Sequence, residues 1–273
     1  MNFRTKRHSI RSLNAANILL ALICALVLAA CGGSDTDDTA ETAPPEAAAA
    51  GDVLASAGDT GTVLSGRVTF DGPRPERAVL QTREDPKCTA MHVDGPLLSD
   101  REIVGEDGGI KNVFVYIKEA PEGDYPAPAE QVVLDQIGCR YVPHVLGVQV
   151  GQEISIENSD PTLHNVRAFA RANRPINNAL PKDSAPRVQK FKNPELAIRM
   201  KCDIHPWMTA FLFAMDHPFF ATTGESGAYT IQGLPPGDYT LVAWHEEYGE
   251  QETAISITDG EGTVADFVFQ PPS

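Results

Sequence analysis

Five cysteines are spread over the 273 residues of this chain, and their surroundings constrain its fold more than any other feature. Cys24 and Cys31 lie near the N-terminus, and Cys88, Cys139 and Cys202 lie further along the chain. A chain of this length can bury a sizeable core without relying on disulfides as its main support. The number is odd, so pairing alone cannot account for every thiol, and each one has to be interpreted from its context.

The N-terminus has the pattern of an export signal. Basic residues are followed by an apolar run, residues 18–30, which is too short to span a bilayer and is typical of a secretory signal peptide. The run ends in Leu-Ala-Ala-Cys at Cys31, which resembles the lipobox of bacterial lipoproteins. This resemblance implies cleavage before Cys31, lipid on its thiol and a membrane anchor, with Gly32 favouring the outer membrane. A plain signal peptide is the alternative.

The charge balance limits the classes of partner. The chain has 22 basic and 37 acidic residues, for a formal net charge of −15. Nucleic acid is therefore not expected as a partner, because no basic field is left to neutralise phosphates. A basic redox protein such as a cytochrome c fits this charge, although the acids can equally serve solubility alone. The acidic stretch at 31–62, rich in small residues, predicts a flexible tether.

Cys202 ends a segment in which apolar and basic residues alternate, and this pattern predicts a strand with the thiol directed into a core. The apolar face comprises Leu196, Ile198, Met200 and Cys202. His205 and Met208 follow at intervals of three residues. A thiolate, an imidazole and a thioether suit copper when a second imidazole completes the set. Structural zinc would need further Cys or His ligands in paired spacing.

His164 is available as the second imidazole. Residues 148–160 predict a hairpin, because apolar residues alternate on both sides of a turn near Gly151. The Asn-Ser-Asp-Pro sequence at 158–161 has turn composition, and His164 and Asn165 follow it directly. One thiolate, two imidazoles and one thioether are thus present in two short segments.

These two segments, 38 residues apart, resemble the type 1 copper site of cupredoxins, and the short second loop is most similar to that of amicyanin. The resemblance implies one copper held by His164, Cys202 and His205, with Met208 as a weak axial ligand. It also implies that Asn165 joins the two ligand loops by hydrogen bonds.

The same resemblance implies a route for electrons. They would pass through the exposed edge of His205, with Pro206 and Trp207 as an apolar docking surface beside it. The alternative is a cupredoxin-like sandwich that has lost its copper, in which Cys202 is a buried and inert thiol.

With the third thiol assigned to copper by this resemblance, Cys88 and Cys139 are the expected disulfide pair. Both have loop-like neighbours, and closing a loop of about 50 residues stabilises by roughly 3–4 kcal/mol in the chain-entropy model. The alternative is a second metal site that uses Cys139 with His144, or the Met-His pair at 91–92.

The C-terminal part resembles a second family. Two alternating segments in residues 227–244 flank a Leu-Pro-Pro-Gly turn and resemble the carboxypeptidase regulatory-like domain, a small transthyretin-like β-sandwich. That family opens with a Gly-x-Val strand, which this part of the chain lacks. Residues 65–72 supply such a strand, and residues 112–117 fit the strand after it.

Together these patterns predict an all-β protein, in which a Greek-key cupredoxin sandwich is inserted into the regulatory-like sandwich. Two sandwiches in series are the alternative. The predicted parts are a signal peptide at 1–30, a tether at 31–62, the regulatory-like sandwich at 63–119 plus 217–271, and the cupredoxin domain at 120–216.

The expected function is electron transfer by one type 1 copper in a lipid-anchored periplasmic or surface-facing protein without catalytic residues. A copper-delivery protein and a non-metal carbohydrate-binding or adhesion module are the alternatives. A multicopper oxidase is disfavoured, because its trinuclear centre needs His-x-His pairs and the sequence has none. His144, His217 and His245 are expected at the surface or between domains rather than as ligands.

Overall fold

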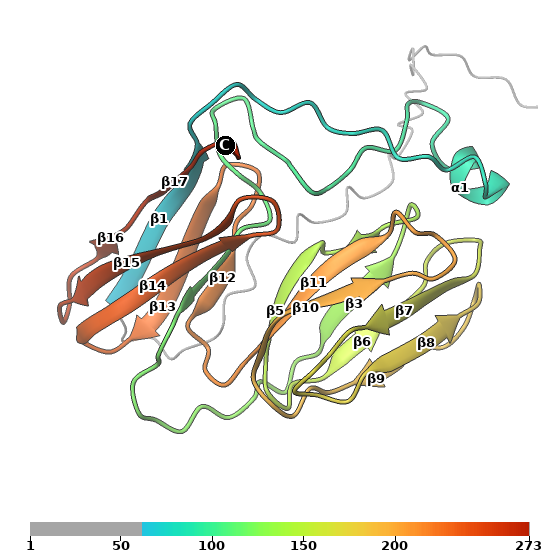
Figure 1. Cartoon of the computed structure of the whole chain (residues 1–273). Coiled ribbons are helices and arrows are strands. Elements are labelled where there is room, and N and C mark those ends of the chain that lie inside the picture. Colours follow the sequence, from blue (N-terminus) through green and yellow to red (C-terminus); the bar gives the residue numbers. More distant parts are fainter. Residues whose placement is uncertain (1–61, 273) are drawn as a thin grey trace, which may run out of the picture. The chain divides into compact units, whose positions relative to one another are not determined.

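The computed structural model describes residues 62–272, which form two β-sandwiches with one short helix (Figure 1). The predicted all-β fold is confirmed. The predicted signal peptide, the lipidation site Cys31 and the predicted tether up to residue 61 lie outside the described residues. Among the residues described, no helix is both long and apolar enough to cross a membrane.

The first sandwich combines strands from both ends of the described chain. One of its sheets contains β13 (Ala228–Leu234), β1 (Thr62–Phe70), β16 (Thr263–Val264) and β17 (Phe267–Phe269). Its second sheet contains, in order, β12 (Phe220–Thr222), β2 (Phe114–Ile117), β14 (Gly237–His245) and β15 (Gly249–Ile257). Alternate residues of these strands point inward, and the resulting core includes Leu64, Ile231 and Leu241.

The second sandwich is built from the strands between β2 and β12. Its larger sheet has the order β5 (Val145–Gln149), β11 (Thr209–Met215), β10 (Glu195–Lys201), β7 (His164–Ala168) and β8 (Ile176–Leu180). Its smaller sheet has the order β4 (Tyr141–Val142), β3 (Val132–Gln136), β6 (Ile154–Ile156) and β9 (Arg187–Gln189). Cys202 and Met208 belong to the buried cluster of this sandwich.

The predicted hairpin over 148–160 is wrong, although both of its strands exist. β5 pairs in parallel with β11, and β6 pairs in parallel with β3 in the other sheet. The turn at Gly151, where φ is +89°, therefore carries the chain from one sheet to the other. Alternation predicts where a strand lies but contains no information about its partner.

The predicted face of the strand before Cys202 is correct only in part. Ile198 and Met200 are buried, but Leu196 is 47% exposed. The register of β10 against β11 shifts between Glu195 and Ile198, and Ala197 has a φ of +49°. This irregularity turns Leu196 away from the core, while the residues after it keep the predicted alternation.

One long connection of the first sandwich packs against the second. Between β1 and β2 the chain forms an isolated bridge from Val79 to Leu98 and the helix α1 (Pro86–Ala90) (Figure 1). Cys88 and Leu97 of this connection belong to the buried cluster of the second sandwich. The connection thus brings residues from the N-terminal part of the described chain to the end of β7 where His164 lies.

An aromatic cluster joins the two sandwiches. The Phe114 and Phe213 rings stack with centroids 4.0 Å apart, and Trp244 lies 5.0 Å from Phe213. Gly147 of β5 has no room for a side chain here, because an added Cβ would lie 2.5 Å from Phe220 and 2.6 Å from Phe114. The absence of a side chain at residue 147 is therefore needed for close packing of this cluster.

We expect Gly147→Ala to lower the free energy of unfolding by about 1–3 kcal/mol, because the added methyl group forces the packed rings apart. Gly95→Ala is the matched control, since an added Cβ there meets nothing within 4 Å, and it should change stability by less than about 0.5 kcal/mol. Urea unfolding followed by tryptophan fluorescence measures both. Equal stabilities of the two variants would contradict this packing argument.

Candidate metal centre

Three buried side chains meet at one end of the second sandwich. His164 is the first residue of β7, and Cys202 directly follows β10, which pairs with β7. The loop after β10 then places His205 beside both. His164, Cys202 and His205 are only 0%, 1% and 2% exposed. Pairing of β7 with β10 thus brings together ligand groups that are 38 residues apart in the sequence.

The ligand atoms of these residues converge on one point. The two Nδ1 atoms of His164 and His205 are 2.8 Å apart, and the Cys202 Sγ lies 3.7 Å from the Nδ1 of His205. Nitrogens about 2.0–2.1 Å from one metal ion, and a sulfur about 2.3 Å from it, have separations of this size. The three groups therefore fit a single metal ion, and a soft thiolate with two imidazoles is a donor set that suits copper.

Met208 closes the loop that carries two of these groups. It is 1% exposed, its amide donates to the carbonyl of His205 at 2.9 Å, and its carbonyl accepts from the amide of Cys202 at 3.3 Å. These bonds hold residues 202–208 in a compact turn at the edge of the buried cluster.

Asn165 links the two segments that carry the ligand groups. Its Oδ1 accepts from the amide of Asp203 at 2.8 Å and from the Cys202 thiol at 3.3 Å. Its Nδ2 donates to Asn177 Oδ1 at 2.7 Å, which ties β7 to β8. A side chain that bonds both segments restricts the position of the sulfur relative to His164.

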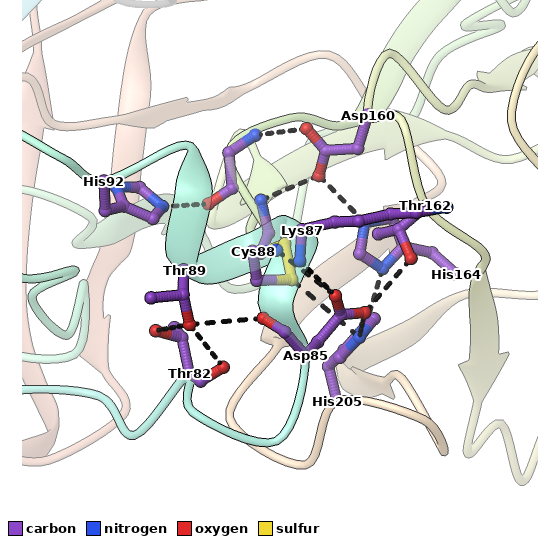
Figure 2. The surroundings of a disulfide bond; sticks show 12 residues. Thr82, Asp85, Lys87, Cys88, Thr89, His92, Asp160, Thr162, His164 and His205 are labelled. Atoms are coloured by element: carbon purple, nitrogen blue, oxygen red, sulfur yellow. Dashed lines mark hydrogen bonds and ion pairs between the residues drawn. A yellow bond between two sulfur atoms is a disulfide. The ribbon is translucent and has the colours of Figure 1, made fainter.

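Two carboxylates bind the outer nitrogens of the histidines (Figure 2). Asp160 Oδ2 is 2.8 Å from Nε2 of His164, and Asp85 Oδ2 is 2.9 Å from Nε2 of His205. A neutral imidazole that donates from Nε2 to a carboxylate has its lone pair on Nδ1, so a metal ion that displaced any Nδ1 proton would meet both Nδ1 atoms directed at the shared point. This is the arrangement in which carboxylates orient histidine ligands of metals.

The sequence analysis predicts neither carboxylate as part of the site. It assigns Asp160 only to a turn, although this residue lies just four positions before the proposed ligand His164. No local signal could identify Asp85, which lies 120 residues from His205 in the sequence. It reaches the site because it caps α1, where its Oδ1 accepts from the amides of Lys87 and Cys88 at 2.8 and 3.3 Å.

The site favours ionised side chains. Burial opposes ionisation of the Cys202 thiol, but hydrogen bonds from His164 and His205 outweigh it and lower its pKa to about 6. Burial likewise opposes the charge on Asp85, yet its bonds with His205 and the α1 amides lower its pKa to about 2. Burial lowers the pKa of His205, and bonds to Cys202 and Asp85 reverse this and raise it. A thiolate is thus available near neutral pH, which metal binding requires.

The disulfide lies directly beside the ligand groups. Cys88 and Cys139 are bonded, with Cα atoms 5.8 Å apart (Figure 2). Cys202 is the free cysteine of the described residues. The Sγ of Cys88 is 3.8 Å from Nε2 of His205. Because Cys139 is oxidised, the alternative metal site that used its thiol with His144 is not formed in this structure.

The prediction that one edge of the His205 ring is exposed to solvent is wrong. The connection that carries α1 covers this histidine, which is 2% exposed and bonded to Asp85. Pro206 is exposed and Trp207 is half-buried. The Trp207 ring lies 5.0 Å from that of His205, and its indole N–H donates to the carbonyl of Cys139 at 3.1 Å. The residue that connects the site to the surface is therefore Trp207.

The other buried histidines lie apart from this group. His144 bonds to Glu246 and so links the two sandwiches, as expected for an inter-domain residue. His217 accepts from the amide of Phe219 at 3.1 Å, and His245 stacks on a tyrosine with centroids 4.4 Å apart. Burial lowers the pKa of His245 to about 3, so this imidazole is neutral. All three are less than 9% exposed, which excludes a surface position.

Two sequence comparisons each found a known protein or domain that matches a part of this chain. The family model for the carboxypeptidase regulatory-like domain matches residues 214–270. A probable rhamnogalacturonate lyase A of Aspergillus flavus is 37% identical over 51 residues, which are 19% of this chain and 10% of that protein. The chain thus spans only a tenth of that relative's length.

Three solved structures similar to part of the chain are an amicyanin, a purple cupredoxin and a copper-containing nitrite reductase. Amicyanin from Paracoccus versutus matches 37% of this chain and 96% of its own, with 20% identity and a TM-score of 0.28. A purple cupredoxin from Nitrosopumilus maritimus matches 32% and 99%, with 20% identity and a TM-score of 0.26. A copper-containing nitrite reductase from Thermus scotoductus matches 36% of this chain and 25% of its own, with 18% identity and a TM-score of 0.29.

We expect Asp160→Asn to weaken copper binding by about 10- to 100-fold, because the imidazole of His164 loses the carboxylate that fixes its orientation. Competition against a Cu(I) chelator measures the affinity. Asp183→Asn, at a side chain that is 81% exposed and pairs only with Lys182, is the matched control and should bind copper like the unaltered chain. An unchanged affinity in Asp160→Asn would show that the carboxylate plays no part in the site.

Proposed function

We propose that this chain binds one copper ion and acts as an electron-transfer protein. Support comes chiefly from the convergence of two imidazole nitrogens, 2.8 Å apart, and the only free thiol of the described residues on one buried point. His164, Cys202 and His205 would hold the ion, with Met208 of the same loop as a fourth, weaker ligand. When bound, copper would supply one-electron chemistry between Cu(I) and Cu(II).

The surroundings suit electron transfer better than substrate turnover. All four proposed ligands are at most 2% exposed, so a substrate would have no direct access to the ion. Hydrogen bonds that the ligand groups donate to Asp85, Asp160 and Asn165 restrain them, and restrained ligands change little in position when the charge of the site changes. Trp207 provides the contact between His205 and the surface.

The rival function is copper delivery, which would use the same ligands. Delivery requires that a recipient reach the ligand groups, and the disulfide and Asp85 cover His205. We therefore expect slow release of the metal. Rapid and complete transfer of copper to a chelator, without denaturant, would support delivery instead.

We expect the purified chain with added Cu(II) to show an intense thiolate-to-copper absorption band in the visible range. Cys202→Ser should abolish this band, because the other two described cysteines are joined to each other. His92→Asn, which alters a histidine outside the ligand group, should retain it. A colourless protein that binds no copper would contradict the proposed function.

The proposed location is the outer membrane, with lipid on Cys31 and the folded part facing the periplasm or the cell surface. A basic redox protein such as a cytochrome c remains the proposed partner, on the evidence of the acidic composition. Cys31→Ser should move the chain from the membrane fraction to the soluble fraction of the producing bacterium. Retention of this variant in the membrane fraction would contradict the lipid anchor.

A further inference from the structure

A cavity of about 260 Å³ lies beside the metal centre, and six of its fifteen lining residues are charged. The second sandwich, the connection between β1 and β2, and the turn after β14 all contribute to its walls. Its charged residues are Arg101, Arg140, Arg199, Lys201, Asp100 and Glu246. Four bases thus face two acids in a chain whose formal net charge is −15.

The two acids neutralise two of the four bases, because Asp100 lies against Arg140 and Glu246 pairs with Arg101. Asp100 Oδ1 is 2.8 Å from Nη2 of Arg77, and Glu246 pairs with His144 and with Arg101. Within residues 62–272, Arg199 and Lys201 of β10 form no ion pair, and the one contact of the Arg199 guanidinium with a ring is to Phe169, whose centroid lies 5.4 Å from its Cζ. The excess positive charge of the cavity is therefore not neutralised by the described part of the protein.

Arg140 has an unmet hydrogen-bonding capacity at this cavity. Its Nε atom is buried and has no partner among the described residues. Its Nη1 lies 3.4 Å from Asp100 Oδ1, a long contact to a carboxylate that Arg77 binds more closely. Nε itself is closed to solvent, so an anion in the cavity would approach the terminal nitrogens of Arg140, of which Nη1 has only this long contact.

We propose that this cavity binds a small oxyanion, carrying carboxylate or phosphate groups, against Arg140, Arg199 and Lys201. Guanidinium groups and ammonium groups recognise such anions by charge-assisted hydrogen bonds. A cavity of this volume accommodates a compact ligand. An acidic protein is a poor fit, because the negative field of the whole chain would repel it, whereas a small anion experiences mainly the local bases.

The cavity also contacts the loop that carries the proposed ligands. Pro206, Trp207 and Met208 form part of its wall. On the proposed function, an anion held there would lie close to the copper and would favour Cu(II) over Cu(I), lowering the midpoint potential. This consequence rests on copper binding, whereas the anion site itself does not.

Binding can be measured by titration calorimetry on the metal-free full chain with inorganic phosphate and, separately, with succinate. We expect at least one of them to bind saturably, one per chain at millimolar or lower concentration, and to bind more weakly as salt is raised. Phosphate alone or succinate alone would each support the site and would identify its chemistry. No saturable binding of either anion would overturn the proposal.

The double variant Arg199→Gln/Lys201→Gln should reduce the affinity at least about tenfold, because two charge-assisted contacts are lost. The matched control is Arg174→Gln/Lys192→Gln, which removes two exposed bases that do not line the cavity and should leave the affinity unchanged. Arg140→Lys keeps the charge but removes the terminal guanidinium nitrogens and should also weaken binding. Equal affinity in the first double variant and its control would overturn the proposal.

The midpoint potential of copper-loaded protein, measured with and without the anions, tests whether the anion site acts on the copper. Phosphate or succinate should lower the midpoint potential of the unaltered chain but not that of Arg199→Gln/Lys201→Gln. If the chain bound no copper, the calorimetric result would still decide whether the anion site exists.

Discussion

The disulfide between Cys88 and Cys139 organises the whole metal centre. Each half-cystine donates its amide to a carboxylate, Cys88 to Asp85 at 3.3 Å and Cys139 to Asp160 at 2.7 Å. Each carboxylate in turn binds one of the two histidines, His205 and His164. The crosslink thus fixes two aspartates, and these fix both imidazoles (Figure 2). The connection after β1, which this crosslink joins to the second sandwich, also covers His205.

The parts of the site that depend on local sequence could be predicted. Cys202, His205 and Met208 lie in one short loop, and the alternation before Cys202 indicates that its thiol points inward. The role of Asp85 and the burial of His205 could not be predicted. Both depend on where a connection 120 residues away in sequence packs, and no periodicity or spacing encodes that placement. The same limit explains the wrong hairpin at 148–160, because alternating residues define strands but leave their partners open.

The two sandwiches also contact each other through side chains. Aromatic rings around Phe114 and Phe213 pack between them, and the His144–Glu246 pair adds a polar link next to that cluster. The basic cavity lies where the turn after β14 approaches the outer face of β10. This arrangement refines the interpretation of the acidic composition. The formal net charge of the chain is −15, whereas the surface beside Trp207 has the opposite local charge.

The proposed copper site is tested most directly by X-ray absorption spectroscopy at the copper edge of the loaded chain. We expect one sulfur at about 2.3 Å or less and two imidazole nitrogens at about 2.0 Å in the first coordination shell. A first shell made of oxygen and nitrogen alone, without a sulfur scatterer, would contradict the assignment of Cys202, His164 and His205 as the copper site.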